Sequence, residues 1–305
     1  ASCGAFYDPE RGEYTLDAFL DDGLSEFGGY DILLLWHAYP RIGADRRNQL
    51  DFYRDMPGGI EGLQTLVARC HDRGVRVFIN YNPWDAGTER ENQSDEDFLA
   101  GFVATTQMDG VFLDTMMGDS PTLRAKLEAA RPGIVLCPEG APPLQALGLC
   151  AASWAQWQAE EQSAAPGILH RKWLEPRHQT WQIWRWMPTH RDEIRRAFFN
   201  GAGMLVWENV FGTYNPWPIQ DRRLWKRCAA ILRQFQDHFA SDAWEPYYPK
   251  TPRRENEGLF IHRWPGAGGD LYTLWMRDQP PPEYGSGRVM YDSMHSPLFD
   301  APDAP

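Results

Sequence analysis

Two carboxylates that end successive apolar runs are the residues of this sequence best suited to chemistry. Val111-Phe112-Leu113 ends on Asp114, and Ile134-Val135-Leu136-Cys137 is soon followed by Glu139. The stretch between the two runs has the pattern of one helix, over residues 121–130. Strand, helix and strand in this order predict two neighbouring parallel strands, each with an acid at its exit.

The predicted spacing fits one kind of reaction. Neighbouring strands lie about 4.8 Å apart. Carboxylates at adjacent strand exits can therefore approach to about 5 to 5.5 Å, the separation that retaining glycosidases use. One carboxylate acts as nucleophile, and the other keeps a proton for the leaving oxygen because its neighbour's charge raises its pKa. Asp is short and suits attack, so Asp114 is the predicted nucleophile. Glu reaches further, so Glu139 is the predicted acid/base.

Further polar and aromatic residues follow predicted strands and are expected at the same mouth. Side chains alternate along a strand, so Asp114 shares a face with Phe112, and Glu139 shares one with Cys137. We expect that face to point inward. The residues expected to hold hydroxyl groups or to stack on the rings of a sugar are His37, Asn80, Asn82, Trp84, Trp154, Trp157, Glu208 and Asn209.

These residues also have structural interpretations. An acid at a strand exit can cap the next helix or bind a loop amide, and His37 could be a hydrogen-bonded structural residue. Tryptophan is abundant, with 14 in 305 residues. Such a surplus can build a dense core as well as a sugar-binding cleft, and an indole N–H needs a partner when it is buried.

The order of the predicted elements favours an α/β fold, a (β/α)8 TIM barrel over residues 1–240. Strands are expected at 2–7, 31–37, 75–82, 110–115, 133–139, 151–157, 168–174 and 204–209, and helices at 15–27, 60–72, 94–107, 121–130, 176–199 and 219–239. An open doubly wound sheet is the alternative. It would usually carry a glycine-rich phosphate turn after its first strand, and "FYDPERGEY" is not one.

The pattern changes after the predicted barrel. "GLFIHRW" and "DLYTLWMRD" are short alternating runs joined by Gly and Pro. They predict a small antiparallel β domain over residues 244–295, sandwich-like and incomplete. The Pro-rich, acidic residues 296–305 are expected to be disordered.

Composition limits the partners. The net charge is −12 without a basic stripe, which argues against nucleic acid and anionic membranes. No apolar run approaches the ~18 residues that a membrane helix needs. Five scattered cysteines indicate neither a zinc site nor a disulfide framework, and unpaired thiols fit a cytoplasmic protein. The expected partner is an oligosaccharide or glycoconjugate, with no cofactor or metal; the sequence leaves the oligomeric state open.

Three motifs carry a family resemblance. "GVRVFINYNPW", "DGVFLDTM" and "VLCPEG" resemble the third, fourth and fifth strands of retaining α-glycosidase barrels, among them the α-amylase, α-galactosidase and endo-α-N-acetylgalactosaminidase superfamilies. The resemblance to the amylase and endo-acetylgalactosaminidase types implies a nucleophile at Asp114 and an acid/base at Glu139, acting on an α-linked glycoside. The α-galactosidase type instead takes its acid from strand six, where "SWAQW" offers none. The chain departs from the amylase pattern at Phe112, where that pattern has Arg, and it lacks the His-Asp pair of strand seven.

Two other functions stay open. A magnesium-dependent barrel lyase or isomerase needs three carboxylates on consecutive strand ends. Here Asn80 and Asn82 precede Asp114 and Glu139, and the next acid is Glu160. A non-catalytic carbohydrate-binding barrel would use the same acids only to accept hydrogen bonds from sugar hydroxyls.

Overall fold

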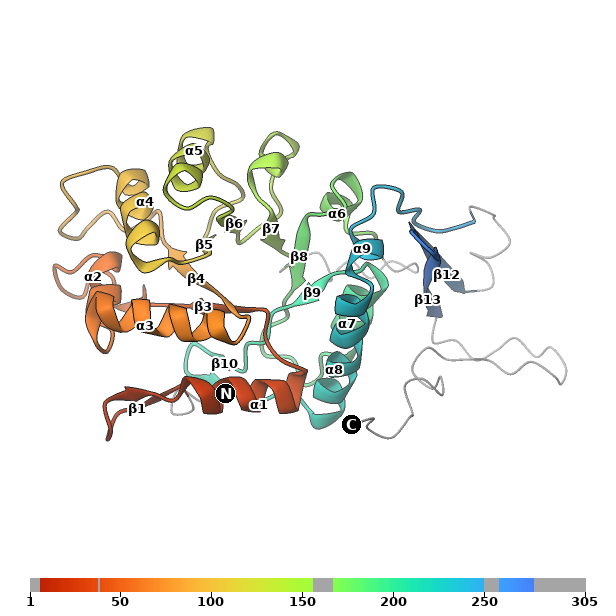
Figure 1. Ribbon diagram of the computed structural model, residues 1–305, viewed down its shortest axis with the longest axis horizontal. Coiled ribbons are helices and arrows are strands. Elements are labelled where there is room, and N and C mark those ends of the chain that lie inside the picture. Colours follow the sequence, from red (N-terminus) through yellow and green to blue (C-terminus); the bar gives the residue numbers. More distant parts are fainter. Residues whose placement is uncertain (1–5, 38, 156–166, 250–257, 277–305) are drawn as a thin grey trace, which may run out of the picture.

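Short parallel strands surrounded by helices form the body of the protein (Figure 1). The computed structural model describes residues 6–37, 39–155, 167–249 and 258–276. In these residues, seven strands run parallel in two hydrogen-bonded groups, β3-β4-β5-β6 and β7-β8-β9, and β6 lies beside β7. Their bounds are β3 Ile32–Leu35, β4 Arg76–Tyr81, β5 Gly110–Leu113, β6 Val135–Pro138, β7 Ala152–Trp154, β8 Gln179–Gln182 and β9 Gly203–Met204.

Two of the helices that follow these strands begin at serine residues that cap them. α4 starts after Ser94, whose hydroxyl accepts from the backbone N–H of Asp97, and α5 starts after Ser120 with a proline in its first turn. The larger helices are α1 Leu16–Phe27, α3 Gly59–Asp72, α4 Asp95–Thr106, α5 Pro121–Ala130, α7 Arg191–Phe199 and α8 Ile219–Gln234.

Shorter elements occupy the connections. After β3 the chain forms η2 (Tyr39–Arg41) and then α2 (Gln49–Arg54), which opens on a capping box between Asn48 and Asp51. The other short elements are β1 Tyr7–Asp8, β2 Glu13–Tyr14, η3 Leu144–Leu149, α6 His170–Leu174, β10 Asn209–Val210, β11 Thr213–Tyr214 and α9 Gln236–Phe239.

The expected first strand, 2–7, lies mostly outside the described residues; at its end, Tyr7–Asp8 forms an antiparallel hairpin with Glu13–Tyr14. The expected seventh strand, 168–174, was wrong, because this stretch contains the short helix α6. The strand at that place in the barrel is β8, in a stretch expected to be helical. Its sequence, QTWQ, has no aliphatic run, and its pairing with β7 and β9 determines its conformation.

The core has two layers, one on each face of the strands. Outward residues such as Val77, Val111 and Leu136 pack with the helices. Inward residues fill the centre of the barrel: Phe78, Phe112, Cys137, Ala152, Trp154 and Ile183, with Trp36, Trp181, Leu205 and Trp207 packed against them. The inward positions follow the expected alternation, so the face that carries the strand-end acids lines the barrel interior.

The expected C-terminal β structure is an antiparallel hairpin, β12 (Leu259–Gly266) with β13 (Gly269–Met276). It lies beside α7 and α9 (Figure 1). Trp264 of the hairpin stacks on Trp244, with ring centroids 4.5 Å apart, and meets Phe239 of α9 edge-on. The predicted domain boundaries remain a prediction, and the expected disordered tail lies outside the described residues. No helix within the described ranges is long and apolar enough to cross a membrane.

Candidate active site

The two predicted catalytic acids meet at the carboxyl end of β5 and β6. Leu113 and Pro138 are paired in the parallel ladder, and the backbone N–H of Glu139 donates to the carbonyl of Leu113 over 3.1 Å. Asp114 and Glu139 therefore leave neighbouring strands at the same level. The two carboxyl groups are close enough to interact electrostatically, because Glu139 helps to raise the pKa of Asp114.

A buried amide chain holds Asp114 from the side of β4. Asn82 Nδ2 donates to Asp114 Oδ2 over 2.8 Å, and Asn80 Nδ2 donates to Asn82 Oδ1 over 2.5 Å. His37 Nε2 lies 3.3 Å from the same Asn80 amide. Gln49 of α2 clamps Asn82 by bonding both its N–H and its carbonyl. Three of the expected sugar-binding residues thus form a buried chain behind the nucleophile position, and Asn82 is the one that touches Asp114.

Glu139 is bound by two donors. The backbone N–H of Thr115 donates to its Oε2 over 2.8 Å, and Arg185 Nη2 donates to its Oε1 over 3.2 Å. Thr115 has φ 60, a left-handed conformation that is costly for a β-branched residue. This conformation directs the Thr115 N–H toward Glu139. Backbone strain of this kind is common at functional sites.

Arg185 was not identified from the sequence. It follows β8 and points into the mouth, where its guanidinium lies 5.0 Å from the ring centroid of Trp207 and 5.7 Å from that of Phe211. Aromatic faces attract a cation at such distances and hold it in place. The only local hint in the sequence is the alternation Trp184-Arg185-Trp186.

Burial raises the pKa of Asp114 to about 6; the neighbouring Glu139 carboxyl adds to the shift, while the Asn82 amide and Arg185 oppose it. Burial also lowers the pKa of His37 to about 4, so this imidazole is neutral at pH 7 and serves the amide chain without charge.

The expected aromatic platforms divide into core and rim. Trp154 is 0% exposed and stacks on Phe112 with centroids 4.0 Å apart, so it fills the barrel interior and the expectation that it stacks on sugar is wrong. Trp84 is 44% exposed at the exit of β4, where a sugar could reach it. Trp157 lies outside the described residues.

The last pair of expected ligands has other partners. Glu208 Oε1 accepts from the backbone N–H of Trp217 over 2.8 Å and from Arg222 Nη2 over 2.9 Å. Trp207 points inward, so Glu208 points to the helical layer and its expected role in sugar binding is wrong. Asn209 starts β10, and its carbonyl accepts from the Trp207 indole over 2.7 Å.

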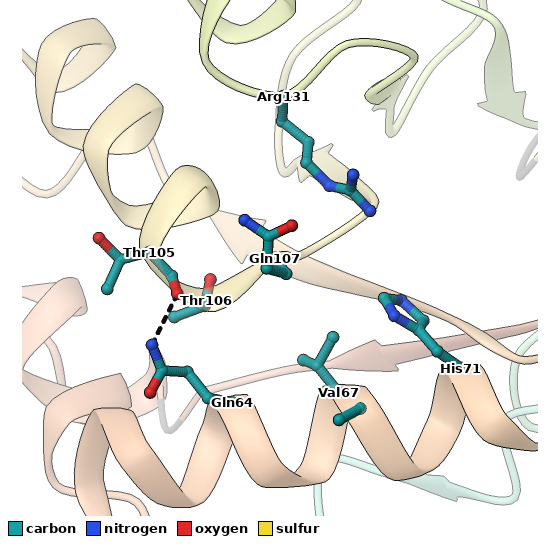
Figure 2. A pocket seen from close by; sticks show the side chains of 8 residues that line it. Gln64, Val67, His71, Thr105, Thr106, Gln107 and Arg131 are labelled. Carbon is teal, nitrogen blue, oxygen red and sulfur yellow. Dashed lines mark hydrogen bonds between the residues drawn. The ribbon is translucent and has the colours of Figure 1, made fainter.

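A second concave region lies away from the acids. A groove of about 260 Å³ opens between α3 and the end of α4, lined by Gln64, Val67, Ala68, His71, Thr105, Thr106, Gln107 and Arg131 (Figure 2). His71 and Arg131 both bind Asp109, which precedes β5, whereas Asp114 follows β5. The groove is therefore at the amino end of the strands, the end that stabilises such barrels.

The acids do not group as metal ligands. Within the ranges that the structure describes, no three His, Cys, Asp or Glu side chains converge as a metal site would require. A magnesium enzyme would place a third carboxylate at the end of β4. This chain has the side-chain amides of Asn80, in β4, and Asn82, just after it, at that place.

Comparison with solved structures identifies the fold. An α-amylase from Geobacillus thermoleovorans, solved with acarbose, superposes with a TM-score of 0.52 and 12% identity over 87% of this chain and 81% of its own. The α-N-acetylgalactosaminidase of Bifidobacterium bifidum superposes with a TM-score of 0.51 and 14% identity, over 90% of this chain and 52% of its own. The α-galactosidase of Saccharomyces cerevisiae superposes with a TM-score of 0.50 and 11% identity, over 84% of this chain and 69% of its own.

The chain has the barrel fold of the glycoside hydrolases. The chain spans about half the length of the acetylgalactosaminidase. No family model matches the sequence, and no curated protein matches it significantly. At identities of 11 to 14% in these structures, the likeness extends only to the fold. Function must be argued from the site.

Proposed function

We propose that this protein is a retaining glycoside hydrolase, with Asp114 as nucleophile and Glu139 as acid/base, acting on an α-linked glycoside. The observation that supports it best is that the two acids leave paired neighbouring strands at the same level, at the carboxyl edge of a glycosidase-type barrel. Neighbouring strands lie about 4.8 Å apart, which fits a retaining pair, at about 5 to 5.5 Å, better than an inverting pair, at about 6.5 to 9.5 Å.

The proposed reaction gives the two acids different roles. It needs a proton on Glu139 and a negative charge on Asp114. Asp114 attacks the anomeric carbon and forms the glycosyl-enzyme ester while Glu139 gives its proton to the leaving oxygen. Glu139 then takes a proton from water, whose oxygen displaces Asp114 and releases the sugar with its configuration retained.

Asn82 and Arg185 prepare this exchange. The Asn82 amide donates to Asp114 and so favours its charged, nucleophilic form. Arg185 bonds Glu139 Oε1 in the free protein, so this contact must open before that oxygen can give a proton to a leaving group. A sugar that enters between the acids and the aromatic rings beneath Arg185 would drive this movement.

Azide rescue tests the proposal. In Glu139→Ala, turnover of an activated aryl glycoside should recover when azide is added, and the product should be a glycosyl azide of retained configuration. Asp119→Ala is a matched control. Burial also raises the pKa of Asp119 to about 6, but neither Asp114 nor Glu139 is among the groups that shift it. A glycosyl azide of inverted configuration, or none, would contradict the proposal.

A non-catalytic carbohydrate-binding barrel remains the second candidate, because Asn82, Thr115 and Arg185 satisfy both acids in the free protein. Glycan binding by the wild-type chain without turnover of any aryl glycoside would favour it.

A further inference from the structure

A continuous series of aromatic rings crosses the mouth beside the acids. Trp84 meets Tyr39 with ring centroids 6.1 Å apart, Tyr39 meets Phe211 at 5.9 Å, and Phe211 meets Trp186 at 6.1 Å. These four residues, called the aromatic track below, come from four different connections: those after β4, β3, β10 and β8.

The track is exposed although its members are large and apolar. Trp84, Phe211 and Trp186 are 44%, 50% and 52% exposed. Single exposed apolar residues are ordinary, but a contiguous series of them marks a binding surface. The backbone supports this interpretation, because Phe211 and Trp186 have φ 51 and 57, a strained conformation for aromatic residues that gathers at functional sites.

The acids lie beside the middle of the track. Both Asp114 and Glu139 act on the Tyr39 hydroxyl through their charges, and burial with these charges raises its pKa. The guanidinium of Arg185, which bonds Glu139, lies over the Phe211 ring, 5.7 Å from its centroid. Trp84 extends the track on one side of Tyr39, and Phe211 with Trp186 extends it on the other. The rings therefore continue beyond the acid pair in both directions.

We propose that the site takes an internal stretch of a glycan chain, with sugar units stacked on Trp84, Phe211 and Trp186 on either side of the bond to be cleaved. This inference rests on the proposed function, and it makes the enzyme endo-acting. A terminal sugar would need a closed pocket and would leave the outer rings unused. Trp84, Phe211 and Trp186 are each at least 44% exposed, and an exposed flat ring face suits the apolar face of a pyranose.

Binding without turnover tests the track separately from catalysis. The full chain carrying Asp114→Asn is titrated calorimetrically with three α-1,4-linked series, built of glucose, galactose and N-acetylgalactosamine, each from the monosaccharide to the hexasaccharide. In at least one series, affinity should rise with each added unit up to about the tetrasaccharide. Trp186→Ala and Phe211→Ala should each weaken hexasaccharide binding roughly three- to tenfold, with a smaller effect on the monosaccharide.

Trp173→Ala is the control, because Trp173 is 48% exposed on α6 and is not a member of the track. It should leave the length dependence unchanged. Affinity that is equal at all lengths, absence of binding in every series, or self-association of the chain that Trp186→Ala abolishes would each overturn the inference. Length-dependent binding by a wild-type chain that hydrolyses nothing would refute the proposed function and leave the track standing.

Discussion

Arg185 and Glu139 form an ion pair of 3.2 Å at the mouth of the barrel, between the exits of β8 and β6. Both side chains are largely withdrawn from water, so the pair is weakly screened. It places a positive charge beside both acids, because Arg185 bonds Glu139 and also lowers the pKa of Asp114.

Removing this cation should change the titration of the other acid. Arg185 lowers the pKa of Asp114, which burial sets at about 6. In Arg185→Ala the pKa of Asp114 should rise further, and Arg185→Lys should restore part of the difference. ¹³C NMR of carboxyl-labelled aspartate would follow it directly. If Asp114 must be ionised to attack, the acidic limb of the activity profile, near pH 6, should move to higher pH in Arg185→Ala.

Arg222→Ala is the control for this measurement. Arg222 also bonds a buried carboxylate, that of Glu208, over 2.9 Å, and Glu208 points away from the mouth. An Asp114 pKa that shifts equally in both variants would mean that the effect is general and not the result of the Arg185 contact.

Neutralising the nucleophile should stabilise the protein while it abolishes activity. The folded-state pKa of Asp114 is raised, so the folded protein binds more protons than the unfolded chain between about pH 4 and 6. The stability that this proton contributes is present below pH 4 and is lost as pH rises through 6. Asp114→Asn should therefore gain about 2 kcal/mol in the free energy of unfolding at pH 7 and little at pH 4, as measured by urea unfolding. A loss of stability at pH 7 would contradict the assignment.

Tryptophans of the core and of the rim should respond differently to truncation. Trp154→Ala removes a fully buried ring stacked on Phe112 and should cost about 3–5 kcal/mol of stability. Trp84→Ala removes a half-exposed ring and should change stability by about 0.5 kcal/mol or less. Thermal unfolding of both variants, with calorimetry to obtain the free energies, would check this. Similar losses in the two would mean that Trp84 also supports the barrel and is not held out for a ligand.

Much of the barrel could be predicted because its central strands are dense in aliphatic residues. The apolar runs that end on Tyr81, Asp114 and Glu139 have the length and composition of buried strands and not of helices. The structure places a strand within each run. The helices between them carry their own caps. Local sequence therefore determined the half of the barrel that positions Asp114 and Glu139.

The other half depends on contacts that no local pattern reports. β8 contains Thr180 and Gln182, polar residues that are buried because neighbouring strands enclose them. The stretch 168–174, expected as a strand, contains the short helix α6, with Lys172 buried and bonded to two backbone carbonyls. Arg185 follows directly on this unpredicted strand, so the register that brings it to Glu139 could not be inferred.

Covalent trapping at Asp114 tests the central claim most directly. The wild-type protein would be incubated with activated fluorosugars of the gluco, galacto and N-acetylgalactosamine types, in which fluorine slows breakdown of the glycosyl-enzyme. Peptide mass spectrometry should then find one sugar attached as an ester to Asp114, and none in Asp114→Asn. A sugar attached to Glu139 instead, or turnover of these compounds with inversion and without any labelled peptide, would contradict the mechanism.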